Sequence, residues 1–205
     1  MSDKKITLVR HGKVNGKPAL YGHTDIELSE QGAQDLRRTL TQLHEREPIN
    51  NIISSPLIRC AALATAFAQE QKIPLQLEPA LKEMNFGVWD GIAFDELVND
   101  WQAVEKFWQS PQSAHAPEGE TLADFAARVI DGWETLLQRT SAGHYLVVCH
   151  GGVIRILIAH VLGIDWCNPK LFQQLQVDYA SHTRIEVGSH PNAMPVIKWI
   201  ATPVN

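Results

Sequence analysis

The sequence predicts an α/β fold: a three-layer sandwich with a mostly parallel central sheet, helices on both faces, and a helical or irregular cap insertion. Short apolar runs rich in β-branched residues alternate along the chain with longer helix-like stretches, which is the pattern of a parallel sheet covered by helices. The 205 residues are 44% hydrophobic and 20% charged, as in a globular chain with a substantial core. Between about residues 82 and 125 the alternation stops, which indicates the insertion.

The first half of the chain reads as strand, helix, strand, helix, strand. Each strand is a short apolar run bounded by polar residues. Ser29 and Glu30 form a helix start with an acid in the first turn, and Pro56 stands where a second, alanine-rich helix can begin. A polar, glycine-bearing loop over about 12–27 separates the first strand from the first helix. The expected elements are strands over 6–9, 51–54 and 75–77 and helices over about 29–47 and 57–71.

The second half begins with the expected cap, about 82–125, which carries half of the six tryptophans and is broken by Pro111 and Pro117. We expect it to be an insertion in one domain that spans residues 1–205. The apolar run 145–149 is the clearest buried strand, and two alternating runs near the end predict an antiparallel hairpin at a sheet edge. The expected elements are helices over about 121–139 and 153–162 and strands over 145–149, 183–187 and 196–201.

Charge and composition exclude several classes of function. The formal net charge is −5, from 18 Lys and Arg against 23 Asp and Glu, so polyanionic partners such as nucleic acid or a membrane surface are not expected. No apolar run approaches the roughly 20 residues of a membrane span. The cysteines Cys60, Cys149 and Cys167 are odd in number and far apart, which favours a reducing, cytoplasmic setting.

Three expected strands are followed by cationic or glycine-rich residues. Arg10 and His11 follow the first strand, Arg59 comes soon after the second, and His150 with Gly151 follows the strand near residue 147. In parallel neighbours these residues meet at one sheet edge. Two guanidiniums and a glycine-rich helix start make an anion pocket suited to phosphate. A neutral histidine in such a pocket can act as a nucleophile that carries a phosphoryl group.

At this point the chain resembles the histidine phosphatase superfamily, the phosphoglycerate mutase-like enzymes. One block alone would be a weak signal, but five blocks occur in the family's order and span most of the chain. The matching blocks are LVRHG (8–12), GHTDIELSEQG (22–32), SSPLIRCA (54–61), EMNFGVWDG (83–91) and VVCHGGVIR (147–155).

The resemblance implies roles for particular residues. His11 is the nucleophile, and Arg10, Arg59 and His150 bind the phosphoryl group. Glu83 is the general acid that protonates the leaving oxygen and then the base that activates water. Further binding positions are Gly22, Gly151 and Asn15, the last in place of the family's phosphate-contacting asparagine. The resemblance implies no cofactor and no metal, and the nine histidines show no His-Glu-x-x-His motif.

The sequence departs from the family pattern after the first histidine. Lys13 and Val14 occupy places where the family commonly has Glu-Thr, and the loop from there to Gly22 is shorter. Asn15 therefore aligns with the family's phosphate-contacting asparagine only if a gap is placed in this loop.

The element Glu-Met-x-Phe-Gly at Glu83 and the stretch 176–179 are similar to α-ribazole phosphatases. The resemblance therefore favours a small phosphomonoester, α-ribazole 5′-phosphate of cobalamin nucleotide loop assembly, whose flat base could stack on Trp89, Trp101 or Trp108 of the cap. Alternatives remain open: a broad-specificity sugar-phosphate or nucleotide phosphatase, a phosphoglycerate mutase, and a phosphate-binding module without catalysis. A homodimer also remains open.

Overall fold

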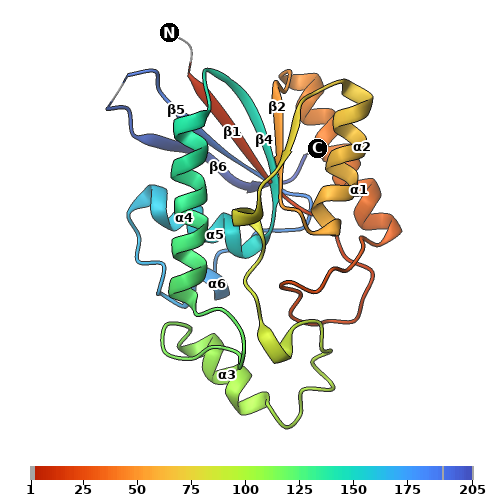
Figure 1. The fold of residues 1–205 in the computed structure, drawn as a ribbon, viewed down its shortest axis with the longest axis vertical. Coiled ribbons are helices and arrows are strands. Elements are labelled where there is room, and N and C mark those ends of the chain that lie inside the picture. The colour runs from red at the N-terminus through yellow and green to blue at the C-terminus, as the bar shows by residue number, and fades with distance from the viewer. Residues whose placement is uncertain (1–2, 191, 205) are drawn as a thin grey trace.

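The computed structural model describes residues 3–190 and 192–204, and its centre is a six-stranded sheet in the order β3-β2-β4-β1-β5-β6 (Figure 1). The first four strands along the chain run parallel, whereas β5 is antiparallel to both of its neighbours. The mostly parallel sheet and the C-terminal hairpin at its edge are thus confirmed. The strands are β1 Lys4–Arg10, β2 Asn51–Ser54, β3 Leu75–Leu77, β4 Gly143–Cys149, β5 His182–Val187 and β6 Pro195–Thr202.

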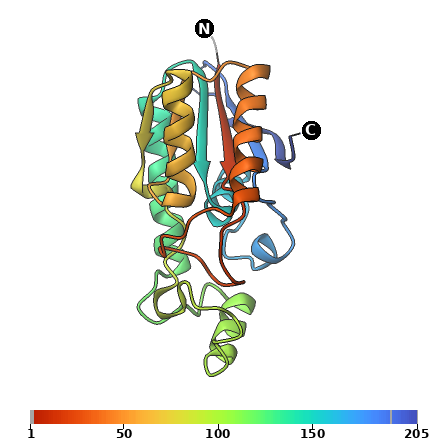
Figure 2. The same ribbon diagram turned by 90° about the vertical axis from the view of Figure 1, so that its right-hand side faces the viewer.

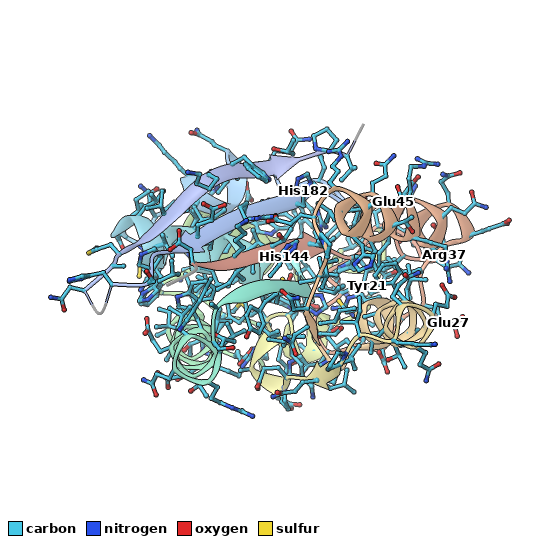
Figure 3. All side chains as sticks on the ribbon, turned by 90° about the horizontal axis from the view of Figure 1, so that it is seen from above. Tyr21, Glu27, Arg37, Glu45, His144 and His182 are labelled. Atoms are coloured by element: carbon cyan, nitrogen blue, oxygen red, sulfur yellow. The ribbon has the colours of Figure 1, made fainter. Side chains whose placement is uncertain are left out.

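Helices cover both faces of the sheet. In the view from above, α1 (Glu30–Arg46) and α2 (Ile58–Gln71) lie on one side, and α4 (Leu122–Arg139) lies on the other (Figure 3). The strands serve both layers because successive side chains point to opposite faces. Val9 and Val148 are buried with the α1–α2 layer, and their neighbours Leu8 and Val147 are buried with the layer of α4 and α5 (Gly151–Leu162).

Helices α1 and α4 begin at the side-chain caps that their sequences predict. Ser29 caps α1 by accepting a hydrogen bond from Gly32 N over 3.0 Å, and Thr121 caps α4 by accepting from Asp124 N over 3.1 Å. Helix α5 ends at Gly163, which has a φ of 63°. It begins at Gly151, two residues before the expected start.

The segment expected to be a cap lies at the end of the sheet toward which β1 and β4 point (Figure 2). It contains the helix α3 (Trp101–Gln109), which the sequence pattern did not resolve, and the short turn η2 (Gly87–Trp89). Trp89 and Phe107 are buried in the same cluster as the sheet residue Val147, so the segment packs against the sheet layer. One domain with an insertion over about 82–125 stays a prediction.

Two further short elements complete the description: η1 (Pro79–Leu81) precedes the cap segment, and α6 (Lys170–Gln173) follows α5. Within residues 3–190 and 192–204, no helix combines the length and the apolar composition needed to cross a membrane.

Candidate active site

The pairing of β1 with β4 brings two histidines together at the carboxyl end of the sheet. Arg10 is in register with Cys149, so His11 and His150 are the residues that follow these paired strands. The backbone N–H of His11 donates to Cys149 O over 3.0 Å, and the two imidazole centroids are 5.2 Å apart. The prediction that these strand ends meet is confirmed.

His11 is buried and neutral. Its Nδ1 lies 2.7 Å from Gly12 O, and a carbonyl can only accept, so Nδ1 carries the proton and Nε2 keeps its lone pair. Burial, with a smaller effect from the charges of Arg59 and Arg10, lowers the pKa of His11 to about 3. The ring therefore has the protonation state that a nucleophile requires.

Arg10 extends from the end of β1 and is held from two sides. Its Nη1 donates to Val177 O over 2.6 Å, and its Cζ lies 3.8 Å from the ring centroid of Tyr179. Its Nε is buried and has no hydrogen-bond partner among the described residues. A buried guanidinium N–H without a partner is costly unless an anion satisfies it, so Arg10 is prepared to bind one.

Arg59, in the first turn of α2, is fully buried and serves mainly to organise the site. Its Nε donates to His150 Nδ1 over 3.3 Å. Its Nη atoms donate to three carbonyl oxygens of the loop after β1, those of Tyr21, Gly22 and Thr24, at 2.7 to 3.0 Å. The guanidinium thus supplies charge to the pocket while most of its N–H groups hold this loop.

The loop is fixed from the other side by Asp90. The carboxylate of Asp90 accepts hydrogen bonds from the backbone N–H groups of Gly22, His23 and Thr24 at 2.6 to 3.0 Å. A side chain at Gly22 would overlap Met84 O and approach the Asp90 carboxylate to 2.5 Å, so only glycine fits there. Gly22 is therefore a structural support of the site whose carbonyl binds Arg59.

His150 is also buried, and both of its ring nitrogens have partners. Because Nδ1 accepts from Arg59, the neutral ring donates from Nε2 to Ser55 Oγ over 2.8 Å. Burial lowers the pKa of His150 well below its usual value, and the charge of Arg59 lowers it further. Cys60 Sγ lies 3.7 Å from His150 Nε2, and burial raises the pKa of that thiol, so it stays protonated.

Glu83 lies against the start of α5. Its Oε2 accepts from Gly152 N over 3.0 Å, and its Oε1 accepts from Met84 N over 3.1 Å. A Cβ at Gly152 would collide with Glu83 Oε1. The glycines of α5 therefore let a carboxylate approach the helix start closely, where its partial positive charge favours an anion.

Arg128 holds the backbone that carries Glu83. It forms a two-pronged ion pair with Glu120, with both N–O distances 2.8 Å, and it donates to the carbonyls of Ala80, Lys82 and Glu83 at 2.9 to 3.3 Å. Such planar double contacts are rigid. They fix the position of Glu83 relative to α5.

A cavity of about 210 Å³ opens beside Glu83 and Gly152. Its walls are mostly apolar, and Arg155 is the cation among its lining residues. The remaining lining residues are Leu20, Met84, Phe86, Phe107, Trp108, Pro111, Leu122, Phe125, Phe172 and Gln173. Of the three cap tryptophans, Trp108 lines the cavity. Trp89 is buried in the core, and Trp101 packs edge-on against Trp108 at the surface.

The predicted binding residue Asn15 is not brought to these side chains. It is exposed, and its backbone N–H bonds Glu27 O over 2.9 Å. Lys13 is exposed as well, whereas Val14 is buried beside Leu28. The geometry therefore gives no support to the role of Asn15, which stays a prediction.

Sequence reasoning missed Tyr179, Arg155, Asp90 and Arg128 as parts of the site. Arg155 and Asp90 lie inside quoted motifs, so a residue-by-residue reading could have marked them. Tyr179 lies in the stretch 176–179 of the resemblance but was given no role there, and Arg128 gave no local signal because it reaches the site only through the tertiary fold. Within the described part of the chain, no three His, Cys, Asp or Glu side chains are grouped as metal ligands, and a reaction without metal remains a prediction.

Comparison with known proteins places this geometry in a family. The model of the histidine phosphatase superfamily (branch 1) matches residues 6–199. A probable phosphoglycerate mutase GpmB of Escherichia fergusonii is 27% identical over 175 residues, which cover 82% of this chain and 79% of that protein. Phosphoserine phosphatase 1 of Hydrogenobacter thermophilus is 28% identical over 193 residues, which cover 93% and 90%.

Two solved structures share the fold over nearly their whole length. YhfR of Bacillus stearothermophilus has a TM-score of 0.87 and 25% identity, with 98% of each chain covered. The α-ribazole phosphatase from Shigella flexneri has a TM-score of 0.83 and 22% identity, with 97% of this chain and 96% of that chain covered. At 22% identity, the similarity to the second structure shows a shared fold.

Proposed function

This chain belongs to the histidine phosphatase superfamily and is a phosphatase-type enzyme, and we propose that it hydrolyses a small phosphomonoester through a phosphohistidine on His11. The observation that carries the proposal is the state of His11: a buried, neutral ring with a free Nε2, next to the unpartnered guanidinium edge of Arg10. A phosphate-binding module would need the arginines, but it would need neither this nucleophile nor Glu83.

In the first step, His11 Nε2 attacks phosphorus and the bond to the ester oxygen breaks. The carboxylic acid form of Glu83 gives its proton to that oxygen as the alcohol leaves. In the second step Glu83 takes a proton from water, the hydroxyl attacks the phosphohistidine, and the P–N bond breaks. Inorganic phosphate leaves and His11 returns to its neutral form.

The pocket stabilises the charge on the transferring group. Arg10 Nε, which has no partner among the described residues, lies 3.4 Å from the position that a Cβ would take on Gly151, and Arg59 donates to His150. The free N–H groups at the start of α5 add partial positive charge. Phosphoryl transfer depends mainly on this positioning and charge stabilisation.

Trapping the intermediate tests the mechanism. The enzyme is mixed with excess para-nitrophenyl phosphate and quenched at alkaline pH, at which a P–N bond survives, and the phosphorylated peptide is identified by mass spectrometry. We expect phosphate on the peptide that contains His11, and none in His11→Ala. Phosphate on another residue, or a fully active His11→Ala enzyme with native circular dichroism, would contradict the proposal.

As its substrate we propose α-ribazole 5′-phosphate, in the assembly of the cobalamin nucleotide loop. The support is the similarity of the Glu83 element to α-ribazole phosphatases and the aromatic cavity beside Glu83, which suits a flat base. A screen of kcat/KM should rank this ester above sugar phosphates and nucleotides. A flat ranking would instead indicate a broad-specificity phosphatase, and interconversion of a phosphoglycerate pair would indicate a mutase.

The setting of the enzyme is part of the same proposal. Cys60, Cys149 and Cys167 are all free thiols, which supports a reducing, cytoplasmic location. A homodimer stays a prediction that the mass in solution would test.

A further inference from the structure

Arg155 is placed between the phosphate pocket and the aromatic cavity. It lies one turn into α5, after Gly151 and Gly152, the second of which donates its backbone N–H to Glu83. Its Nη1 is 2.9 Å from the position that a Cβ would take on Gly151, and the same position is 3.4 Å from Arg10 Nε. The tip of Arg155 therefore lies close to Arg10, and Arg155 lines the cavity together with Glu83.

Two residues of the segment before β5 each accept a hydrogen bond from one arginine, Arg155 or Arg10. Leu175 O accepts from Arg155 Nε over 3.0 Å, and Val177 O accepts from Arg10 Nη1 over 2.6 Å. These carbonyls are two residues apart, so the segment positions both guanidiniums along one side. Arg10 takes the place nearer His11, and Arg155 takes the place nearer the cavity.

The end of Arg155 has unused donors. In the part of the chain that the structure describes, neither Nη1 nor Nη2 of Arg155 has a hydrogen-bond partner. Burial lowers the pKa of Arg155, and the charge of Arg10 lowers it further, whereas Glu83 raises it. A cation in this position gains from an acceptor in the cavity.

The position of the substrate determines which part of the substrate Arg155 can contact. The phosphoryl group must lie at His11, and the ester oxygen must face Glu83 for proton transfer. The rest of the leaving group then extends past Glu83 into the cavity, where the other walls are mainly aromatic and aliphatic. Arg155 supplies the charged donor group of this cavity.

We propose that Arg155 is a specificity-determining residue that donates to an oxygen acceptor on an otherwise apolar leaving group, beyond the ester oxygen. The inference rests on the proposed phosphomonoesterase function and deepens it. A carboxylate and a hydroxyl share this chemistry, and the sugar oxygens of a nucleoside-like ester also provide it. If the leaving group has no acceptor, the Arg155 donors stay unsatisfied next to apolar walls. An ester of that kind is therefore hydrolysed with a lower kcat/KM.

Three matched aryl esters test the inference: phenyl phosphate, meta-hydroxymethylphenyl phosphate and meta-carboxyphenyl phosphate. We expect kcat/KM to favour an acceptor-bearing ester over phenyl phosphate by about 10-fold or more, as for a hydrogen bond to a charged group. Arg155→Met should reduce this preference to near unity. Arg155→Lys should restore part of it for the carboxylate, and Arg139→Met, an exposed residue at the end of α4, should keep the wild-type ratio.

The outcomes separate the inference from the proposed function. A preference for the carboxyl ester alone shows that Arg155 selects an anionic group. A preference for both substituted esters shows that it selects oxygen acceptors in general. Either preference supports the role of Arg155 if Arg155→Met removes that preference. Equal ratios in wild type and Arg155→Met overturn the inference while phenyl phosphate turnover still supports the phosphatase. No turnover of any ester, in a folded enzyme, would count against the proposed function itself.

Discussion

The guanidinium of Arg10 lies over the ring of Tyr179, with 3.8 Å from Cζ to the ring centroid. The same ring is 5.6 Å from the imidazole of His11. Tyr179 is 44% exposed, so it shields the phosphate pocket on its solvent side while it orients the arginine. The contact joins residues that are far apart in the sequence and binds the segment before β5 to the end of β1.

Replacing Tyr179 tests whether this contact positions Arg10. Tyr179→Leu should weaken binding of inorganic phosphate roughly 2- to 30-fold, the range of one cation–π contact. Tyr179→Phe keeps the aromatic face and should bind like the wild type. Isothermal titration with phosphate measures both variants. If leucine and phenylalanine have equal effects, the aromatic face has no positioning role.

Gly152→Ala should damage proton donation more than phosphate binding. Alanine favours a helix over glycine by about 1 kcal/mol, so the variant should fold. Its methyl group would collide with Glu83 Oε1 and displace the carboxylate from the start of α5. Because a general acid contributes about 100-fold or more, alkyl phosphates should lose at least that factor in kcat/KM, and para-nitrophenyl phosphate should lose much less.

The control for Gly152→Ala is Glu83→Gln, which removes the acid and leaves the helix start unchanged. A plot of log kcat/KM against the pKa of the leaving group should become steeper in both variants. A uniform loss for all leaving groups in both would exclude Glu83 as the acid.

The sequence was sufficient to predict the residues that follow strand ends. Arg10, His11 and His150 stand directly after apolar runs, and parallel pairing of those runs brings them together whatever the details of the loops. Glu83 was predicted only through the resemblance, since nothing in its local pattern separates it from a surface carboxylate. Its place at the start of α5 depends on the two-pronged Arg128–Glu120 pair, which joins α4 to the cap segment.

The remaining parts of the site depend on long-range packing. Tyr179 belongs to a segment without periodicity, and its contact with Arg10 follows from how the chain returns to β5 beside β1. The role of Asn15 stays a prediction: the residue type fits it, but Asn15 is exposed, and among the described residues no contact joins its side chain to His11. The tryptophans of the cap could not be sorted by composition, and burial of Trp89 is a consequence of its packing with Phe107.

Asp90→Asn should destabilise the loop that holds Arg59. The carboxylate accepts from four backbone N–H groups, those of Gly22, His23, Thr24 and Phe86. An amide offers one oxygen and turns an NH₂ group toward the others, so we expect a loss of about 2–4 kcal/mol in the free energy of unfolding. Urea denaturation measures it. Asp95→Asn, which removes an exposed ion pair with Lys17, should leave the free energy of unfolding nearly unchanged; equal losses in both variants would contradict the anchoring role of Asp90.

Activity should not depend on a divalent metal. The proposed mechanism uses His11 as nucleophile and arginines for charge, so no step calls for a Lewis acid. Assays after dialysis against a chelator, with and without added magnesium, zinc or manganese, should give equal kcat/KM. A rate that falls with the chelator and returns with one metal would rule out this form of the mechanism.

Stability should fall as the solution is acidified below the ordinary histidine range, and His11 should account for part of the fall. Its pKa is about 3 in the folded protein against 6.5 for an unperturbed histidine, so between these values the unfolded chain binds more protons. Unfolding therefore becomes easier as pH decreases through that window, and stability increases with pH within it.

Between about pH 7 and pH 4 the Tm of the wild type should fall more than that of His11→Gln. The measurement uses phosphate-free buffer, because a bound anion would stabilise the native state. His190→Gln, at an exposed position, should follow the wild-type curve. Parallel curves for wild type and His11→Gln would mean that His11 is protonated in the folded enzyme at ordinary acidic pH, and the neutral nucleophile would then lose its main support.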